Sequence, residues 1–336
     1  MSSVNLRPEM FNWGYLGCGD VCELKSAPEC FTTAGGDTTV AAVMRRNIDA
    51  AIEFALRHGV DRACSTVDEL LDPQGGGGVN AVYIATPPVY HLENALECIA
   101  KGIKYLYIEK PMTLNAEDAR IIKQKAEEAG TQVTVAHYRN ELPMYKAIEE
   151  MIQGGTVGKI RSVNIRIWQA KTGTDGGWRV DPEISGGGLF HDLSPHVLAL
   201  MYKFFGPFKN AHGKQLRSDG GKVADQVTGM ATFCDDIQFT GSWCFSVPSC
   251  EEVDECLVVG SKGSLRFPFF KGSDVTLRVE GQEEKKVTFE HPNHIQQPFI
   301  HSMMAALRSD GHEAGNPCSC DDAIAVMEVM DAFTQD

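Results

Sequence analysis

The chain lacks any long apolar run: none approaches the roughly 20 residues that a membrane helix needs. Residues 1–8 are polar and lack the apolar core of a signal peptide. Basic residues are also outnumbered, with 31 Lys and Arg against 45 Asp and Glu and a net charge of -14. This balance argues against a nucleic-acid binder and against binding to an anionic membrane surface. We therefore expect a cytoplasmic protein with a small-molecule partner; an anionic ligand in a local basic pocket remains compatible.

The sequence also contains no complete motif for a zinc site or for a phosphate-binding loop. Among the 11 cysteines, Cys18 and Cys22 have no matching second pair nearby, and Cys318 and Cys320 are too close together for a usual zinc pair. We expect mostly buried, reduced thiols and no metal site. The glycine run at 75–78 is not followed by Lys-Ser or Lys-Thr, so it predicts only a loop.

The length of 336 residues favours two domains, and the first half alternates between short apolar strands and longer helices. Such alternation predicts a parallel sheet whose ligands lie at the carboxyl ends of the strands. The strands are expected at 12–16, 38–44, 81–85, 105–108 and 132–136, and the helices at 48–58, 91–101 and 115–130.

A glycine turn follows the first of these strands. It reads Gly17-Cys18-Gly19-Asp20-Val21-Cys22, a G-x-G-x-x-C pattern. Gly17 permits a tight turn, Gly19 lets the backbone approach a pyrophosphate, and Cys22 takes the third, small-residue position. Placed directly after a strand of an α/β chain, this pattern predicts that residues 17–21 bind a dinucleotide.

The end of the second strand indicates which dinucleotide. An acidic residue there would bind the ribose diol of NAD, but the chain has Met44-Arg45-Arg46. Two guanidinium groups suit a 2′-phosphate, so we predict NADP over NAD. The alternative is that Arg45 and Arg46 are a solvated pair at the start of a helix.

The second half follows a different pattern, with many alternating apolar and polar runs. These runs predict an α/β domain with an open, mostly antiparallel sheet. We place the boundary between a doubly wound Rossmann domain at 1–137 and a substrate and oligomerisation domain at 138–336, whose last helices can pack back on the first domain. Strands are expected at 159–170, 226–233, 237–245, 255–259, 264–267 and 275–279, and helices at 143–153, 193–205, 298–307 and 321–333.

Three residues carry the expected chemistry. Lys110 ends a buried strand in Glu109-Lys110-Pro111, and Asp192 and His196 follow the glycine run at 186–188. At i, i+4 spacing Asp192 and His196 share one helix face. A lysine, a carboxylate and an imidazole in one cleft can bind a hydroxyl and move a proton.

Taken together, these motifs make the chain similar to the glucose-fructose oxidoreductase/inositol dehydrogenase (Gfo/Idh/MocA) family. The resemblance covers nearly the whole length and is specific for the family but not for the substrate. The motifs that carry it are Gly17-Cys18-Gly19-Asp20, Ala85-Thr86-Pro87-Pro88 with His91, Glu109-Lys110-Pro111, Trp178-Arg179, Gly186 to His196 and Gly260-Ser261-Lys262-Gly263-Ser264.

The resemblance implies roles for individual residues. Lys110 would contact the reacting oxygen, His196 would be the general acid/base, and Asp192 would position it. Some relatives have Tyr where this chain has His196. Further cofactor-binding candidates are Thr86, Pro87, His91, Glu109, Lys110, Trp178 and Arg179, and the substrate-binding candidates are Lys110, Tyr138, His191, Asp192 and His196. His91 could instead cap a helix, and Trp178 and Arg179 could simply pack.

The resemblance also implies a homo-oligomer, a dimer or tetramer, formed through the second sheet. The leading hypothesis is an NAD(P)-dependent enzyme that transfers hydride between the cofactor and a sugar, a cyclic polyol or a related diol or carbonyl compound. Three alternatives stay open. They are a dihydrodiol dehydrogenase acting on an apolar ring, a non-catalytic nucleotide sensor of the same fold, and a glycosidase that uses bound cofactor transiently.

Overall fold

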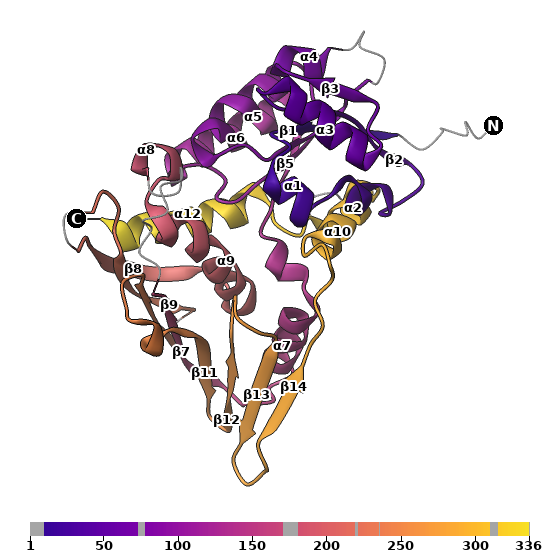
Figure 1. Cartoon of the computed structure of the whole chain (residues 1–336). Coiled ribbons are helices and arrows are strands. Elements are labelled where there is room, and N and C mark those ends of the chain that lie inside the picture. The colour runs from indigo at the N-terminus through magenta and orange to yellow at the C-terminus, as the bar shows by residue number, and fades with distance from the viewer. Residues whose placement is uncertain are drawn as a thin grey trace.

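The computed structural model describes residues 10–72, 78–170, 181–218, 221–234, 236–309 and 315–335. The first half forms a six-stranded sheet and the second an eight-stranded sheet. Figure 1 shows helix α12 (Cys320–Thr334) running between the two parts of the molecule, where it packs on helices and strands of both. The expected α/β class with a Rossmann sheet and a second, mostly antiparallel sheet is confirmed.

The strands of the first sheet are all parallel and lie in the order β3-β2-β1-β4-β5-β6. The order reverses beside β1, so a crevice opens at the carboxyl ends of β1 and β4. Both faces are covered by helices, which explains why the central strands are almost wholly apolar. The strands are β1 (Phe11–Leu16), β2 (Thr38–Met44), β3 (Arg62–Cys64), β4 (Ala81–Ile84), β5 (Tyr105–Ile108) and β6 (Gln132–Val135).

Two of the longer helices of this part, α3 and α6, begin at an asparagine cap and end at a glycine. Asn47 accepts hydrogen bonds from two backbone N–H groups at the start of α3, and Gly59 ends it in the left-handed conformation. At α6, Asn115 accepts one such bond, from the N–H of Asp118, and Gly130 ends the helix in the left-handed conformation. The helices are α1 (Asp20–Leu24), α2 (Pro28–Thr32), α3 (Ile48–His58), α4 (Val67–Leu71), α5 (His91–Ala100) and α6 (Ala116–Ala129), with 3-10 turns η1 (Pro88–Tyr90) and η2 (Tyr138–Glu141).

The second sheet has the order β14-β13-β12-β11-β7-β10-β9-β8. All its neighbouring strands are antiparallel except β7 and β10. Alternate residues of β7 are buried under helices while the others stay accessible. The strands are β7 (Ile160–Trp168), β8 (Phe208–Leu216), β9 (Gln226–Phe233), β10 (Ile237–Cys244), β11 (Val253–Gly260), β12 (Gly263–Phe267), β13 (Asp274–Val279) and β14 (Lys285–Thr288).

The helices of the second half connect the two apolar cores. Phe299 and Met303 of α10 lie in the core of the Rossmann sheet. Val326 and Met330 of α12 lie in the core of the second sheet. The helices are α7 (Pro143–Gln153), α8 (Pro182–Ser185), α9 (Gly188–Phe205), α10 (Gln297–Leu307) and α12, with a 3-10 turn η4 (Ser249–Glu251).

Three strands were not predicted, and one helix begins earlier than expected. β3 is only 3 residues long, while β8 and β14 are polar and largely exposed edge strands without a clear apolar alternation. Helix α9 begins at Gly188 rather than Leu193, which places Asp192 inside the helix with His196. No helix in the described ranges is long and apolar enough to cross a membrane.

Close packing of α12 on β8 makes a stability prediction. A Cβ atom on Gly213 would lie 2.5 Å from the carbonyl oxygen of Thr228 and 2.8 Å from Cα of Phe333. Both are backbone atoms that cannot swing away, so Gly213→Ala should lower the free energy of unfolding by about 1–3 kcal/mol. Urea denaturation measures this loss. Gly36→Ala, with no atom within 4 Å of the added Cβ, is the control; equal stability of the two variants would contradict the packing.

Candidate active site

A cleft of about 710 Å³ lies at the carboxyl ends of β1, β2, β4 and β5 and reaches α9 of the second half. Its position agrees with the expectation from the strand order. Predicted residues that line it are Gly17, Gly19, Asp20, Val21, Arg45, Arg46, Thr86, Pro87, Glu109, Lys110, Tyr138, His191, Asp192 and His196. Trp178 and Arg179 lie outside the described residues.

The glycine turn forms one wall of the cleft. Gly17 has a φ of +97°, and a Cβ there would approach the backbone nitrogen of Thr86 to 2.9 Å. The nearest atom to a Cβ on Gly19 would be 3.9 Å away, so the chain leaves open space beside Gly19 for a ligand. Cys18 points instead into the core, and burial raises the pKa of its thiol to about 11. Only the backbone of Cys18 is therefore suited to contact a ligand.

Arg45 and Arg46 are exposed at the rim, directly after β2. The guanidinium carbon of Arg46 lies 5.7 Å from the ring centroid of Tyr90. Met44 occupies the position where a carboxylate would bind the ribose diol of NAD. The rim of the cleft at this end is thus basic and aromatic.

His91 does not line the cleft but lies beneath it, completely buried. Its Nε2 is 2.7 Å from the carbonyl oxygen of Thr86, and its Nδ1 is 3.0 Å from that of Pro111. Burial lowers the pKa of its imidazole, although these carbonyl groups act in the opposite direction. His91 therefore joins the loop after β4 to the loop after β5.

Glu109 is also buried and is held by several donors. Its Oε1 accepts hydrogen bonds from the hydroxyl of Tyr83 and from Nε2 of Gln296, both at 2.6 Å. The Tyr107 hydroxyl donates to Oε1 of Gln296 at 2.7 Å, and the Tyr83 hydroxyl lies 3.0 Å from Oγ of Ser26. This network fixes the end of β5 against α10 and the segment after α1.

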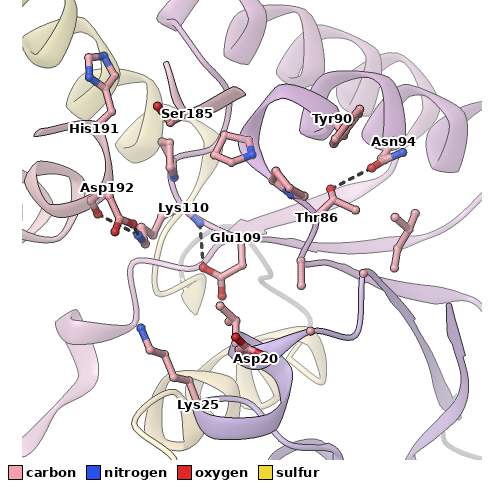
Figure 2. Close-up of a pocket in the computed structure, with 18 of the residues that line it drawn as sticks. Asp20, Lys25, Thr86, Tyr90, Asn94, Glu109, Lys110, Ser185, His191 and Asp192 are labelled. Atoms are coloured by element: carbon pink, nitrogen blue, oxygen red, sulfur yellow. Dashed lines mark hydrogen bonds and ion pairs between the residues drawn. The ribbon is translucent and has the colours of Figure 1, made fainter. Parts of the chain in front are cut away.

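Lys110 and Asp192 join the two halves of the cleft (Figure 2). The ammonium of Lys110 donates to Oδ1 of Asp192 at 2.7 Å and to its backbone carbonyl oxygen at 2.9 Å. Burial alone would lower the pKa of the ammonium, but the Asp192 carboxylate and other acidic groups outweigh it and the pKa is raised. Lys110 is therefore charged, although its side chain is only 9% exposed.

His196 lies deeper, next to Tyr138. Its Nε2 is 3.5 Å from the Tyr138 hydroxyl, to which Lys25 donates at 3.4 Å. Among the described residues no hydrogen-bond partner reaches Nδ1 of His196. Burial and the neighbouring charges of Lys110, Arg139 and Lys25 hold the pKa of His196 well below its ordinary value. The lowered pKa favours the neutral imidazole.

His191 stands apart from this group. Figure 2 shows its ring pointing away from Lys110 and Asp192, and it borders a second hollow of about 230 Å³ as well as the main cleft. Burial lowers the pKa of His191 to about 4. It is a weaker candidate for contact with a substrate at Lys110.

Several residues that line the cleft were not foreseen. Lys25, Arg139 and Phe270 lie at the inner end, and Tyr90 and Asn94 flank the rim. Arg139 directly follows the predicted Tyr138, so its basic charge was a usable signal. Lys25 and Phe270 have no local pattern that marks them. Within the described ranges, no group of three or more His, Cys, Asp or Glu residues could hold a metal ion.

Comparison with known families agrees with this geometry. Residues 11–137 match a family model described as an oxidoreductase family with an NAD-binding Rossmann fold. Residues 145–266 match a model described as the GFO/IDH/MocA C-terminal domain. The chain therefore belongs to the Gfo/Idh/MocA family of NAD-binding oxidoreductases.

Individual proteins similar to this chain are named as oxidoreductases or dehydrogenases. Oxidoreductase P35 of Formosa agariphila is 40% identical over 96% of this chain and 98% of its own length. A trans-1,2-dihydrobenzene-1,2-diol dehydrogenase of Mus musculus is 30% identical over 59% of this chain and 57% of its own. A solved levoglucosan dehydrogenase, in complex with NADH and levoglucosan, has the same fold, with a TM-score of 0.82 and 18% identity over 97% of this chain and 96% of that one.

The buried network around Glu109 makes a second stability prediction. Tyr83→Phe removes a hydroxyl that donates to the carboxylate at 2.6 Å, and should lower the free energy of unfolding by about 1.5–3 kcal/mol. Tyr145→Phe removes a bond to the neutral carbonyl of Phe269 at 3.0 Å, and should cost only about 0.5–1.5 kcal/mol. Chemical denaturation of both variants measures the difference. A smaller loss for Tyr83→Phe would show that the Glu109 network is not an anchor.

Proposed function

We propose that this protein is an NAD(P)-dependent dehydrogenase or reductase that transfers hydride between the nicotinamide cofactor and a CH–OH carbon of a sugar, cyclic polyol or related diol. The observation that carries the proposal is the meeting of Lys110, Asp192 and His196 at the inner end of a cleft whose outer wall is the glycine turn. A protein that only senses a nucleotide would need the glycine turn but not these three residues.

The cofactor would lie along the outer part of the cleft. The open space beside Gly19 and the close approach of Gly17 to Thr86 leave room for a pyrophosphate against the backbone. Thr86 and Pro87 would line the path toward Lys110. When bound, a nicotinamide would accept or supply the hydride.

Lys110 would bind the substrate oxygen. Its ammonium is charged, nearly buried and held by Asp192. In such a site a fixed positive charge stabilises the alkoxide character that develops as hydride leaves the carbon. Asp192 would keep the ammonium in place. Because Asp192 and His196 lie on the same face of α9, Asp192 would also fix the position of the ammonium relative to His196.

His196 would move the proton. When an alcohol is oxidised, the hydroxyl proton must pass to a base as the carbon loses hydride. The lowered pKa of His196 keeps its imidazole neutral and able to accept that proton. In the reverse direction the same nitrogen would return the proton to the carbonyl oxygen.

NADP is the cofactor we favour. Arg45 and Arg46 stand exposed at the rim, where the adenosine ribose would bind, and Met44 supplies no carboxylate to hold a ribose diol. Guanidinium groups suit the 2′-phosphate. Arg46 lies over Tyr90 at 5.7 Å, which supports an ordered side chain at this position.

The substrate class is supported by the family and by the names of relatives. These include levoglucosan dehydrogenase, 1,5-anhydro-D-fructose reductase and an NADP-dependent scyllo-inositol 2-dehydrogenase, all named for oxygenated rings. A dihydrodiol dehydrogenase is the second candidate, because Tyr138 and Phe270 give the inner end two aromatic rings. Comparison of turnover on polyols and on aromatic dihydrodiols distinguishes the two.

Assembly and compartment are proposed on separate grounds. The second sheet has an open face, and Met230 on β9 is 47% exposed there and Leu216 on β8 is 54% exposed, which supports a homo-oligomer formed through this sheet. All 11 cysteines are free thiols, which supports a reducing compartment such as the cytoplasm.

Replacement of His196 tests the chemistry. His196→Ala should reduce turnover by about two to four orders of magnitude with near-normal binding of NADPH. Steady-state rates and fluorescence titration measure the two effects. His212→Ala, an exposed histidine on β8, is the control. Unchanged turnover in His196→Ala would remove this residue from the mechanism.

The pH dependence of kcat/KM in the wild-type protein and in His196→Ala tests the direction of the pKa shift of His196. Since the pKa of His196 is lowered from 6.5, the neutral base persists as pH falls. The kcat/KM for alcohol oxidation should therefore show no loss due to His196 between neutrality and pH 6.5. A loss with a midpoint at or above 6.5 that disappears in His196→Ala would be inconsistent with this environment.

Titration with NADPH and, in parallel, NADH tests the cofactor site without a known substrate. Wild-type protein should bind both and prefer NADPH, whereas combined Arg45→Ala and Arg46→Ala should weaken NADPH far more than NADH. Arg120→Ala, an exposed arginine on α6, is the control. Equal losses would mean that the two arginines do not contact the phosphate, and binding of neither nucleotide would overturn the proposed function.

A further inference from the structure

The inner end of the cleft collects positive charge although the whole chain has a net charge of -14. Lys25 comes from the end of α1, Lys110 follows β5, and Arg139 lies in η2. Lys25 Nζ and Arg139 Cζ lie 5.8 and 5.9 Å from the centroid of the Tyr138 ring. Three separate segments thus bring cations to the place where a substrate would lie.

The two carboxylates nearest Lys110 are both occupied. Asp192 pairs with Lys110, and Glu109 accepts from Tyr83, Gln296 and the backbone N–H of Lys110. Asp20 of α1 lines the cleft as well. Among the described residues, neither Lys25 nor Arg139 forms an ion pair.

The guanidinium of Arg139 is held by two contacts, while its Nε–H donor has no partner among the described residues. Its Nη1 donates to the carbonyl oxygen of Phe269 at 2.6 Å, and its guanidinium carbon lies 4.8 Å from the ring centroid of Phe270. Its Nε is buried, and no hydrogen-bond partner in the described part of the chain reaches it. Arg139 lines the cleft, and a buried charged donor without a partner is costly, which supports a ligand acceptor beside this guanidinium.

We propose that Lys25 and Arg139 bind a carboxylate on the substrate, so that the enzyme acts on an acidic sugar or polyol and presents one of its hydroxyl groups to Lys110 and His196. This inference rests on the proposed function. A planar monoanion suits an ammonium without an ion pair among the described residues, beside a guanidinium that already donates through Nη1 to Phe269. A phosphoryl group carries more charge and takes more donors than these two side chains offer.

A bound carboxylate would also change the electrostatic potential at His196. Lys110, Arg139 and Lys25 all act to lower its pKa. A substrate carboxylate held between Lys25 and Arg139 would offset part of this positive field. Binding of the acid and acceptance of its hydroxyl proton by His196 would then favour each other.

The test compares substrates that differ only in the acidic group. D-glucuronate and D-galacturonate are assayed against glucose, galactose and the corresponding hexose 6-phosphates, with NADP⁺ and NAD⁺. Direct calorimetric titration of the cofactor-bound protein with both hexuronates measures binding independently of turnover. We expect the hexuronates to exceed the neutral hexoses in binding or kcat/KM by about 10- to 100-fold.

Variants identify the side chains. Lys25→Met and Arg139→Lys should each reduce the ratio of hexuronate to hexose binding, and the ratio of their kcat/KM values, by about tenfold or more. Lys125→Met, an exposed lysine on α6, is the control. Arg139→Lys keeps the positive charge but removes the paired N–H donors of the guanidinium. A loss of hexuronate binding in this variant would therefore not be due to a missing side chain.

The outcomes separate this inference from the proposed function. If NADPH fails to bind, the proposed function itself is overturned. If NADPH binds but both hexuronates fail to bind, or bind no better than the hexoses, the carboxylate site is wrong. Preference for hexose 6-phosphates would replace the carboxylate by a phosphoryl group. Loss of NADPH binding in Lys25→Met would assign Lys25 to the cofactor and overturn its role here.

Discussion

The ion pair between Lys110 and Asp192 is the constraint on which the site depends. The two residues are 82 positions apart in the chain, one after the last central strand of the Rossmann sheet and one on the first turns of α9. Their pairing at 2.7 Å brings the second half of the chain onto the end of the cofactor cleft. His196 lies one helical turn further along α9. The packing of α12 on elements of both halves supports the same arrangement.

Buried polar groups hold the pair from behind. Glu109 precedes Lys110 and is fixed by Tyr83 and Gln296, while His91 bridges the loops that follow β4 and β5. Polar groups this deep are stable only when their hydrogen bonds are satisfied. The hydrogen bonds of Glu109 and His91 therefore help to keep the loops after β4 and β5 in place behind Lys110.

Electrostatics gives this end of the cleft a character unlike that of the whole protein. An acidic chain concentrates Lys25, Lys110 and Arg139 around one histidine, and burial strengthens their effect because little water remains to screen them. Burial first, and then the charges of these three groups, lower the pKa of His196 and favour its neutral form. The same charges attract an anion.

The sequence by itself determined the local features: the alternation of strands and helices, the glycine turn after β1, and the caps Asn47 and Asn115. It also indicated Lys110, at the carboxyl end of a parallel strand, and Asp192 with His196, by their i, i+4 spacing after a glycine run. Only the tertiary structure decided that Cys18 and His91 face inward, that polar edge strands such as β8 complete the second sheet, and that Lys25, Arg139 and Phe270 converge on Tyr138. Such convergence depends on how distant segments pack, and no local periodicity of the chain records it.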